Sequence, residues 1–144
     1  MLIPGRSRTL NSSREKGFTL VELLIVVAIV AVLAMIAYPS YQDYIREGRR
    51  SDAFDALLLV QNLQEKWRAN NSTYGSLANI GYGGTASQEG FYTIAVSGTS
   101  ATGYTTTASA VSGTTQAGDT GCTTLTITVS AANPRGAKTP AACW

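Results

Sequence analysis

Few side chains in this sequence could take part in acid–base or nucleophilic chemistry. The chain has no histidine, so Ser-His-Asp and Cys-His catalytic sets cannot be built in their usual form. Glycines 81, 83 and 84 lack the strand-to-helix context of a phosphate-binding or dinucleotide-binding loop. After Ala69 the charged residues are only Glu89, Asp119, Arg135 and Lys138. We therefore expect no enzyme and no bound cofactor.

Two cysteines, Cys122 and Cys143, are the remaining reactive groups. With two thiols and no histidine, a four-ligand zinc site of the usual kinds cannot be assembled, and no metal site is expected. Both cysteines follow a long apolar segment, on the side of it that would be exported, where thiols can oxidise. The sequence therefore predicts a disulfide between Cys122 and Cys143.

Glu22 is the only charged residue between Phe18 and Tyr38, a run of 21 residues. A helix of that length reaches about 31 Å, which matches the ~30 Å hydrocarbon core of a bilayer. A carboxylate in such a segment costs roughly 2.5 to 3.5 kcal/mol at the membrane centre, so it is a candidate functional group. The alternative is a side chain near the helix end that reaches the lipid headgroups.

The residues Gly17-Phe18-Thr19-Leu20-Val21-Glu22 follow a short polar, basic leader. This arrangement resembles the type III signal of bacterial type IV prepilins and pseudopilins. The resemblance implies that a dedicated peptidase cuts between Gly17 and Phe18 and that Phe18 is then methylated. In this family a Glu is the fifth residue after the cut and a Pro the twenty-second, which are the places of Glu22 and Pro39. Both residues are therefore candidate assembly residues.

The leader carries Arg6, Arg8, Arg14 and Lys16 against Glu15, a net charge of +3. Such a charge beside an apolar span predicts a cytoplasmic amino terminus and an exported carboxyl-terminal part. We expect a single-pass inner-membrane protein with a periplasmic head, which becomes extracellular in the assembled pilus. An ordinary secretory signal is the competing interpretation, and it would place cleavage near Met35 after the weak Val32-Leu33-Ala34 motif.

The helical pattern resumes after Pro39, although proline kinks or locally opens a helix. Apolar or small residues then recur in steps of three and four as far as Trp67, and this stripe predicts a helix able to cover a sheet. On the same helix, Asp43–Arg46 and Glu47–Arg50 are opposite charges three residues apart. The arginines at 46, 49 and 50 either form a solvated face or meet acids on neighbouring subunits.

Three segments have the composition of strands, at 91–97, 104–111 and 122–129. In the last of these, Leu125, Ile127 and Val129 alternate with threonines, which gives one buried face. Between helix and sheet, residues 73–90 are glycine-rich and predict a surface loop, which in pilins is the variable αβ-loop. The predicted fold is α+β and pilin-like: a long N-terminal helix, transmembrane in its first half, packed on a small antiparallel sheet. Its parts are a leader at 1–17, a transmembrane and filament-core helix at 18–45, and a head at 46–144.

The resemblance implies a structural subunit of a type IV pilus, and the short head ending in Cys143-Trp144 is most similar to minor pilins of the PilE kind. Its implied partners are other pilin subunits, through the N-terminal helix, and the prepilin peptidase and methylase. It also implies support of pilus assembly, twitching motility and cell adhesion. A type II secretion pseudopilin and a DNA-uptake pilin are the alternatives. From Phe18 onward, 7 Lys and Arg oppose 8 Asp and Glu, so nucleic acid is the less expected partner.

Overall fold

The computed structural model describes residues 17–144, and the predictions about the leader up to residue 16 lie outside these residues. The described chain falls into two compact units, one ending at Tyr38 and the other running from Pro39 to Trp144. Helix α1 (Leu20–Arg68) contributes its first part to one unit and its second part to the other. Pro39 lies inside α1, and the helix continues through it.

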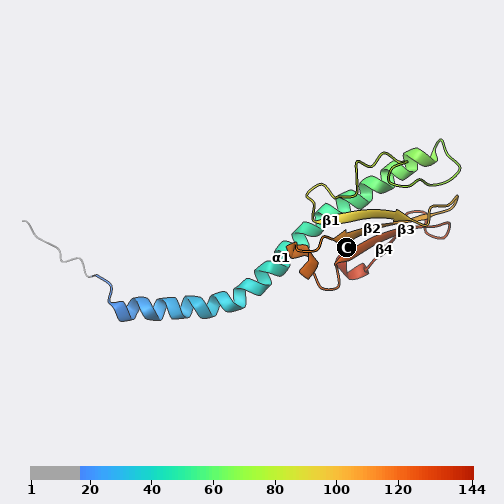
Figure 1. Cartoon of the computed structure of the whole chain (residues 1–144). Coiled ribbons are helices and arrows are strands. Elements are labelled where there is room, and N and C mark those ends of the chain that lie inside the picture. The colour runs from blue at the N-terminus through green and yellow to red at the C-terminus, as the bar shows by residue number, and fades with distance from the viewer. Residues whose placement is uncertain (1–16) are drawn as a thin grey trace, which may run out of the picture. The chain divides into compact units, whose positions relative to one another are not determined.

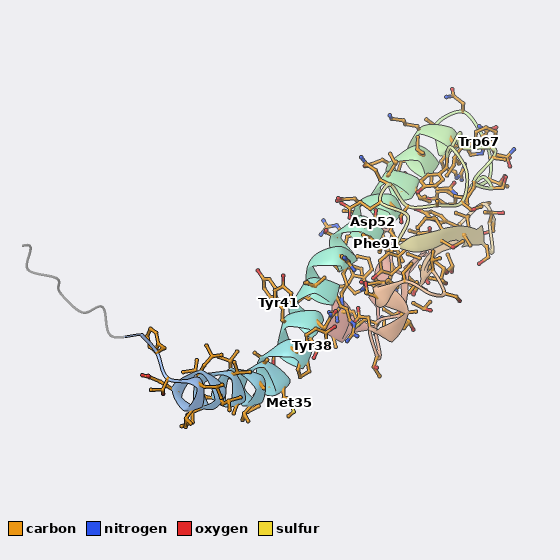
Figure 2. The ribbon with its side chains drawn as sticks, turned by 60° about the vertical axis from the view of Figure 1, so that its left-hand side comes forward. Met35, Tyr38, Tyr41, Asp52, Trp67 and Phe91 are labelled. Carbon is orange, nitrogen blue, oxygen red and sulfur yellow. A yellow bond between two sulfur atoms is a disulfide. The ribbon has the colours of Figure 1, made fainter. Side chains whose placement is uncertain are left out.

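The first unit consists of the apolar part of α1 and the residues just before it. Thr19 caps the helix, because its hydroxyl accepts a hydrogen bond from the Glu22 backbone N–H at 3.2 Å. Every side chain from Phe18 to Tyr38 is exposed, and Figure 2 shows them projecting from all sides of the ribbon. In the described residues, α1 is the one helix whose length and composition suit a membrane crossing.

The second unit is a helix on a sheet (Figure 1). The sheet contains β1 (Tyr92–Ser97), β2 (Tyr104–Ala110), β3 (Thr124–Val129) and β4 (Ala137–Thr139), in the order β1-β2-β3-β4 with antiparallel neighbours. Short 3-10 helices η1 (Thr115–Gly118) and η2 (Ala141–Cys143) lie in the connections. The predicted α+β class and the three predicted strands are confirmed, whereas β4 was not predicted.

The core lies between the second part of α1 and one face of the sheet. Alternate residues of β1, β2 and β3 point inward, and α1 covers them with residues spaced three and four apart. Each large apolar side chain buried here stabilises the fold by about 1.5 to 3 kcal/mol. The main contributors are Leu57 and Val60 from α1 and Tyr92, Ile94, Leu125 and Ile127 from the sheet, and the small Ala53 is also fully buried.

A disulfide joins Cys122 to Cys143, as predicted, and both cysteines are buried. It fixes the carboxyl terminus next to α1, where the Trp144 ring stacks on Phe54 with the ring centres 4.7 Å apart. The ammonium group of Lys138 lies 4.5 Å from the centre of the Trp144 ring. The last residues of the chain are thus an integral part of the head.

Candidate functional site

The residues expected to direct processing and assembly lie at the start of the apolar unit. Gly17 and Phe18 precede the helix in non-helical backbone and are exposed, so the peptide bond between them is open to a protease. Glu22 follows in the first helical turn, where a negative charge is favourable to the partial positive charge of a helix N-terminus. The structure brings Gly17, Phe18 and Glu22 into one short segment, whereas Pro39 begins the other unit.

The apolar unit exposes its hydrophobic side chains. Its large side chains are between 54% and 84% exposed. Contiguous apolar surface of this size is covered in nature by lipid or by another protein. The helix therefore has the chemistry to bind a bilayer and then other apolar helices.

At the start of the head, three arginines of α1 hold the segment around η1. Arg46 donates from Nε to the Thr115 carbonyl oxygen at 3.2 Å, and Arg49 donates to the Thr115 hydroxyl. Arg50 donates from Nε and Nη2 to the two carboxylate oxygens of Asp119, each at 2.8 Å. This hydrogen-bonded carboxylate raises the pKa of Arg50 above its usual value.

Arg46 and Arg50 each stand three residues after an acid, and the structure gives them different partners. The Asp43–Arg46 pair is present at 2.8 Å, as predicted. Arg50 fits neither predicted alternative, a solvated face or an acid on a neighbouring subunit. It pairs with Asp119 of its own head, and the Arg50 and Asp119 side chains are only 17% and 6% exposed. A bidentate partner in a shielded position holds a guanidinium better than an exposed carboxylate one turn away.

A buried carboxylate, Asp52, anchors the entry into β1. It accepts hydrogen bonds from the Ser87 hydroxyl at 2.6 Å and from the backbone N–H groups of Glu89 and Phe91 at 3.0 and 3.3 Å. Figure 2 shows Asp52 on α1 beside Phe91. The guanidinium carbon of Arg49 lies 4.5 Å from the Phe91 ring centre, so helix and loop are joined twice at this point.

A second buried polar side chain, Gln64, fixes the start of the αβ-loop. Its amide donates to the Gly75 carbonyl oxygen at 2.6 Å and accepts from the Gly75 N–H at 2.9 Å, as a neighbouring strand would. A Cβ at residue 75 would lie 3.0 Å from the Trp67 indole nitrogen, so a glycine suits this close approach. These contacts hold the start of the loop against the helix.

Charged side chains gather at the end of α1, where Lys66 and Arg68 outnumber the exposed Glu65. Lys66 is exposed, and Arg68 donates to the carbonyl oxygens of Asn71 at 2.6 Å and Ala101 at 2.9 Å. The Arg68 guanidinium also lies 5.6 Å from the ring centre of Tyr74. Arg68 therefore ties the helix end, the αβ-loop and the β1–β2 connection together while keeping its charge at this end of the head.

The sequence reasoning missed Asp52, Gln64, Gln116 and Asp119. Asp52 carried a signal, since it stands four residues before the apolar-face residue Ala56. Asp119 carried another, as an isolated charge in a long uncharged region. In residues 17–144, no group of three or more His, Cys, Asp or Glu residues could hold a metal ion.

An exposed apolar helix behind a prepilin-like start, joined to a helix-on-sheet head closed by a disulfide, defines the class of type IV pilins. The comparisons with known families agree with this class. A model of the prokaryotic N-terminal methylation motif matches residues 12–38.

A second family model matches residues 39–126, which is more than half of the chain. It is described as type IV minor pilin ComP, DNA uptake sequence receptor. The chain belongs to this family of type IV minor pilins. The family also implies assembly with other pilus subunits and processing of a prepilin. No curated protein matches the chain significantly.

Proposed function

We propose that this minor pilin is made as a precursor, cut between Gly17 and Phe18, methylated on Phe18, and held in the inner membrane with its head in the periplasm. It then leaves the membrane and enters the pilus through the same helix. The observation that carries this proposal is the apolar part of α1, whose side chains are exposed on every side. Lipid satisfies this surface before assembly, and the helices of other pilins satisfy it afterwards.

Glu22 supplies specificity in this scheme. Cleavage creates a positive α-amine on Phe18, and the Glu22 carboxylate of one subunit can pair with the amine of the next. Within an apolar helix bundle such a pair is attractive, while either charge alone is penalised. Smooth apolar faces can slide, so one ion pair selects a single axial offset, and Pro39 lets the helix adjust beyond it.

The test is a comparison of the chain in membranes and in filaments. Pili sheared from cells are purified, and the chain is detected by immunoblot and counted by quantitative mass spectrometry. We expect a subunit that begins with N-methylated Phe18 and is present at a small fraction of the major pilin. A protein confined to the membrane, or one that begins near Met35, would contradict the proposal.

We further propose that the head captures DNA. The matching family is described as a DNA uptake sequence receptor, and this description supports the proposal. The end of the head supplies two positive charges, Lys66 and Arg68, against one acid, Glu65, which also lies near Tyr74. The head has no net positive charge, because residues 39–144 hold seven Lys and Arg and also seven Asp and Glu. Several of these charges are already paired or buried, among them Arg50, Asp52 and Asp119.

DNA capture is tested with the full-length chain in detergent micelles and a labelled duplex. Contacts to phosphates release counterions, so the logarithm of the binding constant should fall linearly with the logarithm of salt concentration. We expect Lys66→Ala and Arg68→Ala to weaken binding, and Arg49→Ala, about five helical turns earlier in α1, to leave it nearly unchanged. Absence of binding to both the duplex and its separated strands at low salt would refute this second function.

A further inference from the structure

A groove runs between the last turns of α1 and the glycine-rich segment at 80–88. It consists of two neighbouring hollows that share Leu63. One, of about 450 Å³, is lined in part by Leu59, Tyr82 and Gln88. The other, of about 390 Å³, is lined in part by Lys66, Trp67 and Asn70. Trp67 marks the position of this second hollow in the last helical turns in Figure 2.

The two hollows repeat the same chemistry. Each combines an apolar floor with one aromatic side chain, Tyr82 in the first and Trp67 in the second. Each also carries side-chain amides, from Gln88 in the first and from Asn70 and Asn71 in the second. Lys66 is the one charged residue in the two linings, and no acid is among them. Apolar floor, aromatic ring, amide and cation are the groups that bind an unpaired nucleotide.

The walls of the groove are held in place by the chain itself. The Tyr82 hydroxyl donates to the Ala86 carbonyl oxygen at 3.1 Å, and the Asn71 amide donates to the Trp67 carbonyl oxygen at 2.8 Å. The Gln64–Gly75 hydrogen bonds fix the loop that faces the helix. Lys66 and Asn70 remain exposed at the rim. A binding surface that is already ordered loses less entropy when it takes a ligand.

We propose that this groove binds two successive nucleotides of single-stranded nucleic acid, with Lys66 against a phosphate. The inference rests on the proposed capture of DNA and names the form of the ligand. In a duplex, the base faces are stacked and the pairing edges are occupied, so an unpaired stretch or a frayed end is the form that offers both to the groove. The lining itself holds a cation and no acid, although Glu65 and Glu89 lie exposed next to it in the sequence, and a cation in the lining favours an anionic ligand over an uncharged partner segment.

The test uses the full-length chain in detergent micelles in a Trp144→Phe background, in which Trp67 is the remaining tryptophan. Its fluorescence is followed as a short oligothymidine or a duplex of equal length is added. We expect saturable quenching by the oligothymidine and weaker binding of the duplex. Tyr82→Ala should weaken oligothymidine binding about tenfold through lost stacking, while Tyr82→Phe, which keeps the ring, should bind normally.

Lys66→Ala should lower the salt slope for oligothymidine by about 0.7, as expected for one lost phosphate contact. Arg135→Ala removes an exposed charge outside the groove lining and should leave the slope unchanged. Equal binding of duplex and single strand, with groove variants unaffected, would overturn the groove and leave DNA capture standing. Failure to bind either nucleic acid would overturn both. Groove variants that lower pilus incorporation but not oligothymidine binding would identify a subunit contact and also overturn the inference.

Discussion

Arg50 and Asp119 form a bidentate ion pair that joins α1 to the segment after η1, across 69 residues of sequence. The Gln116 amide donates to the same carboxylate at 2.9 Å and to the Arg46 carbonyl oxygen at 3.1 Å. Asp119 then leads directly to Cys122, whose N–H donates to the Asp119 carbonyl oxygen at 2.9 Å. The pair therefore positions the disulfide-bonded segment on the helix.

We expect Asp119→Ala to lower the free energy of unfolding by about 3 kcal/mol, because it leaves a shielded guanidinium without its partner. Chemical unfolding of the full-length chain in micelles measures this change. Asp43→Ala is the matched control, since it removes the exposed partner of Arg46 and should cost less than about 1 kcal/mol. Equal losses in the two variants would show that the Arg50–Asp119 pair has no special weight.

Tyr92 should make the stability of the head depend on pH in the alkaline range. Burial raises its pKa from the usual value of 10.0 to about 12, because the charged phenolate would lie in the core. Because the pKa of Tyr92 is higher in the folded chain than in the unfolded chain, the neutral phenol contributes to the free energy of unfolding. This contribution is fully present below pH 10 and is lost as the pH rises to about 12. We therefore expect stability to fall in that window, as unfolding experiments at successive pH values can show.

Tyr92→Phe is the control for this titration. The Tyr92 hydroxyl lies near the Gln116 side chain but makes no hydrogen bond of good geometry, so its removal should cost little at pH 7. The variant should lose less stability than the wild type between pH 10 and 12. Identical pH profiles would exclude Tyr92 as their source.

The Cys122–Cys143 bond should contribute about 3 kcal/mol by restricting the unfolded chain, since it closes a loop with a sequence separation of 21. A double Cys→Ser variant should unfold at a lower denaturant concentration and resemble the reduced wild type. Reductant should not affect the variant further. Thiol labelling of the non-reduced exported protein should find no free cysteine, and two reactive thiols would contradict the bond.

The sequence predicted the elements whose periodicity extends over several turns or residues. The stripe ending at Trp67 and the alternation of Leu125, Ile127 and Val129 are enough to place the helix and β3, because one buried face requires that spacing. Strand β4 could not be found in this way. It has only three residues, Ala137–Thr139, and its side chains are exposed, so its composition carries no pattern.

Contacts between distant segments were beyond such reasoning. The i, i+3 rule offered Glu47 to Arg50, but the fold offers Asp119, and nothing in local spacing shows which carboxylate is brought close. The expected processing residues could be named from the sequence because their signal is contiguous, from Gly17 to Glu22, and their role stays a prediction. The groove is not, because its walls come from α1 and a loop that meet only after folding.

Replacement of Gly17 by a bulky residue should leave an uncut precursor in the membrane. The peptidase must reach the bond between Gly17 and Phe18, and the residues there are exposed and lie outside the helix. Amino-terminal sequencing and a shift in electrophoretic mobility report the cut. Wild-type processing of a Gly17→Trp variant would show that another bond is the cleavage site.

Glu22 should be required for assembly and dispensable for insertion. The apolar side chains around it carry the membrane anchoring, and neutralising one carboxylate makes insertion more favourable rather than less. Glu22→Gln keeps the shape and removes the charge, whereas Glu22→Val also removes the polar group. Both variants should be inserted and cut after Gly17, yet be poorly recruited into pili, because neither can pair with the α-amine of a neighbouring subunit. Glu22→Asp, which keeps the charge, is expected to recover part of the incorporation.

The readouts are membrane fractionation for insertion and an immunoblot of sheared filaments for recruitment. Wild-type incorporation of both neutral variants would refute the ion pair and leave Glu22 as a charge tolerated near the headgroups.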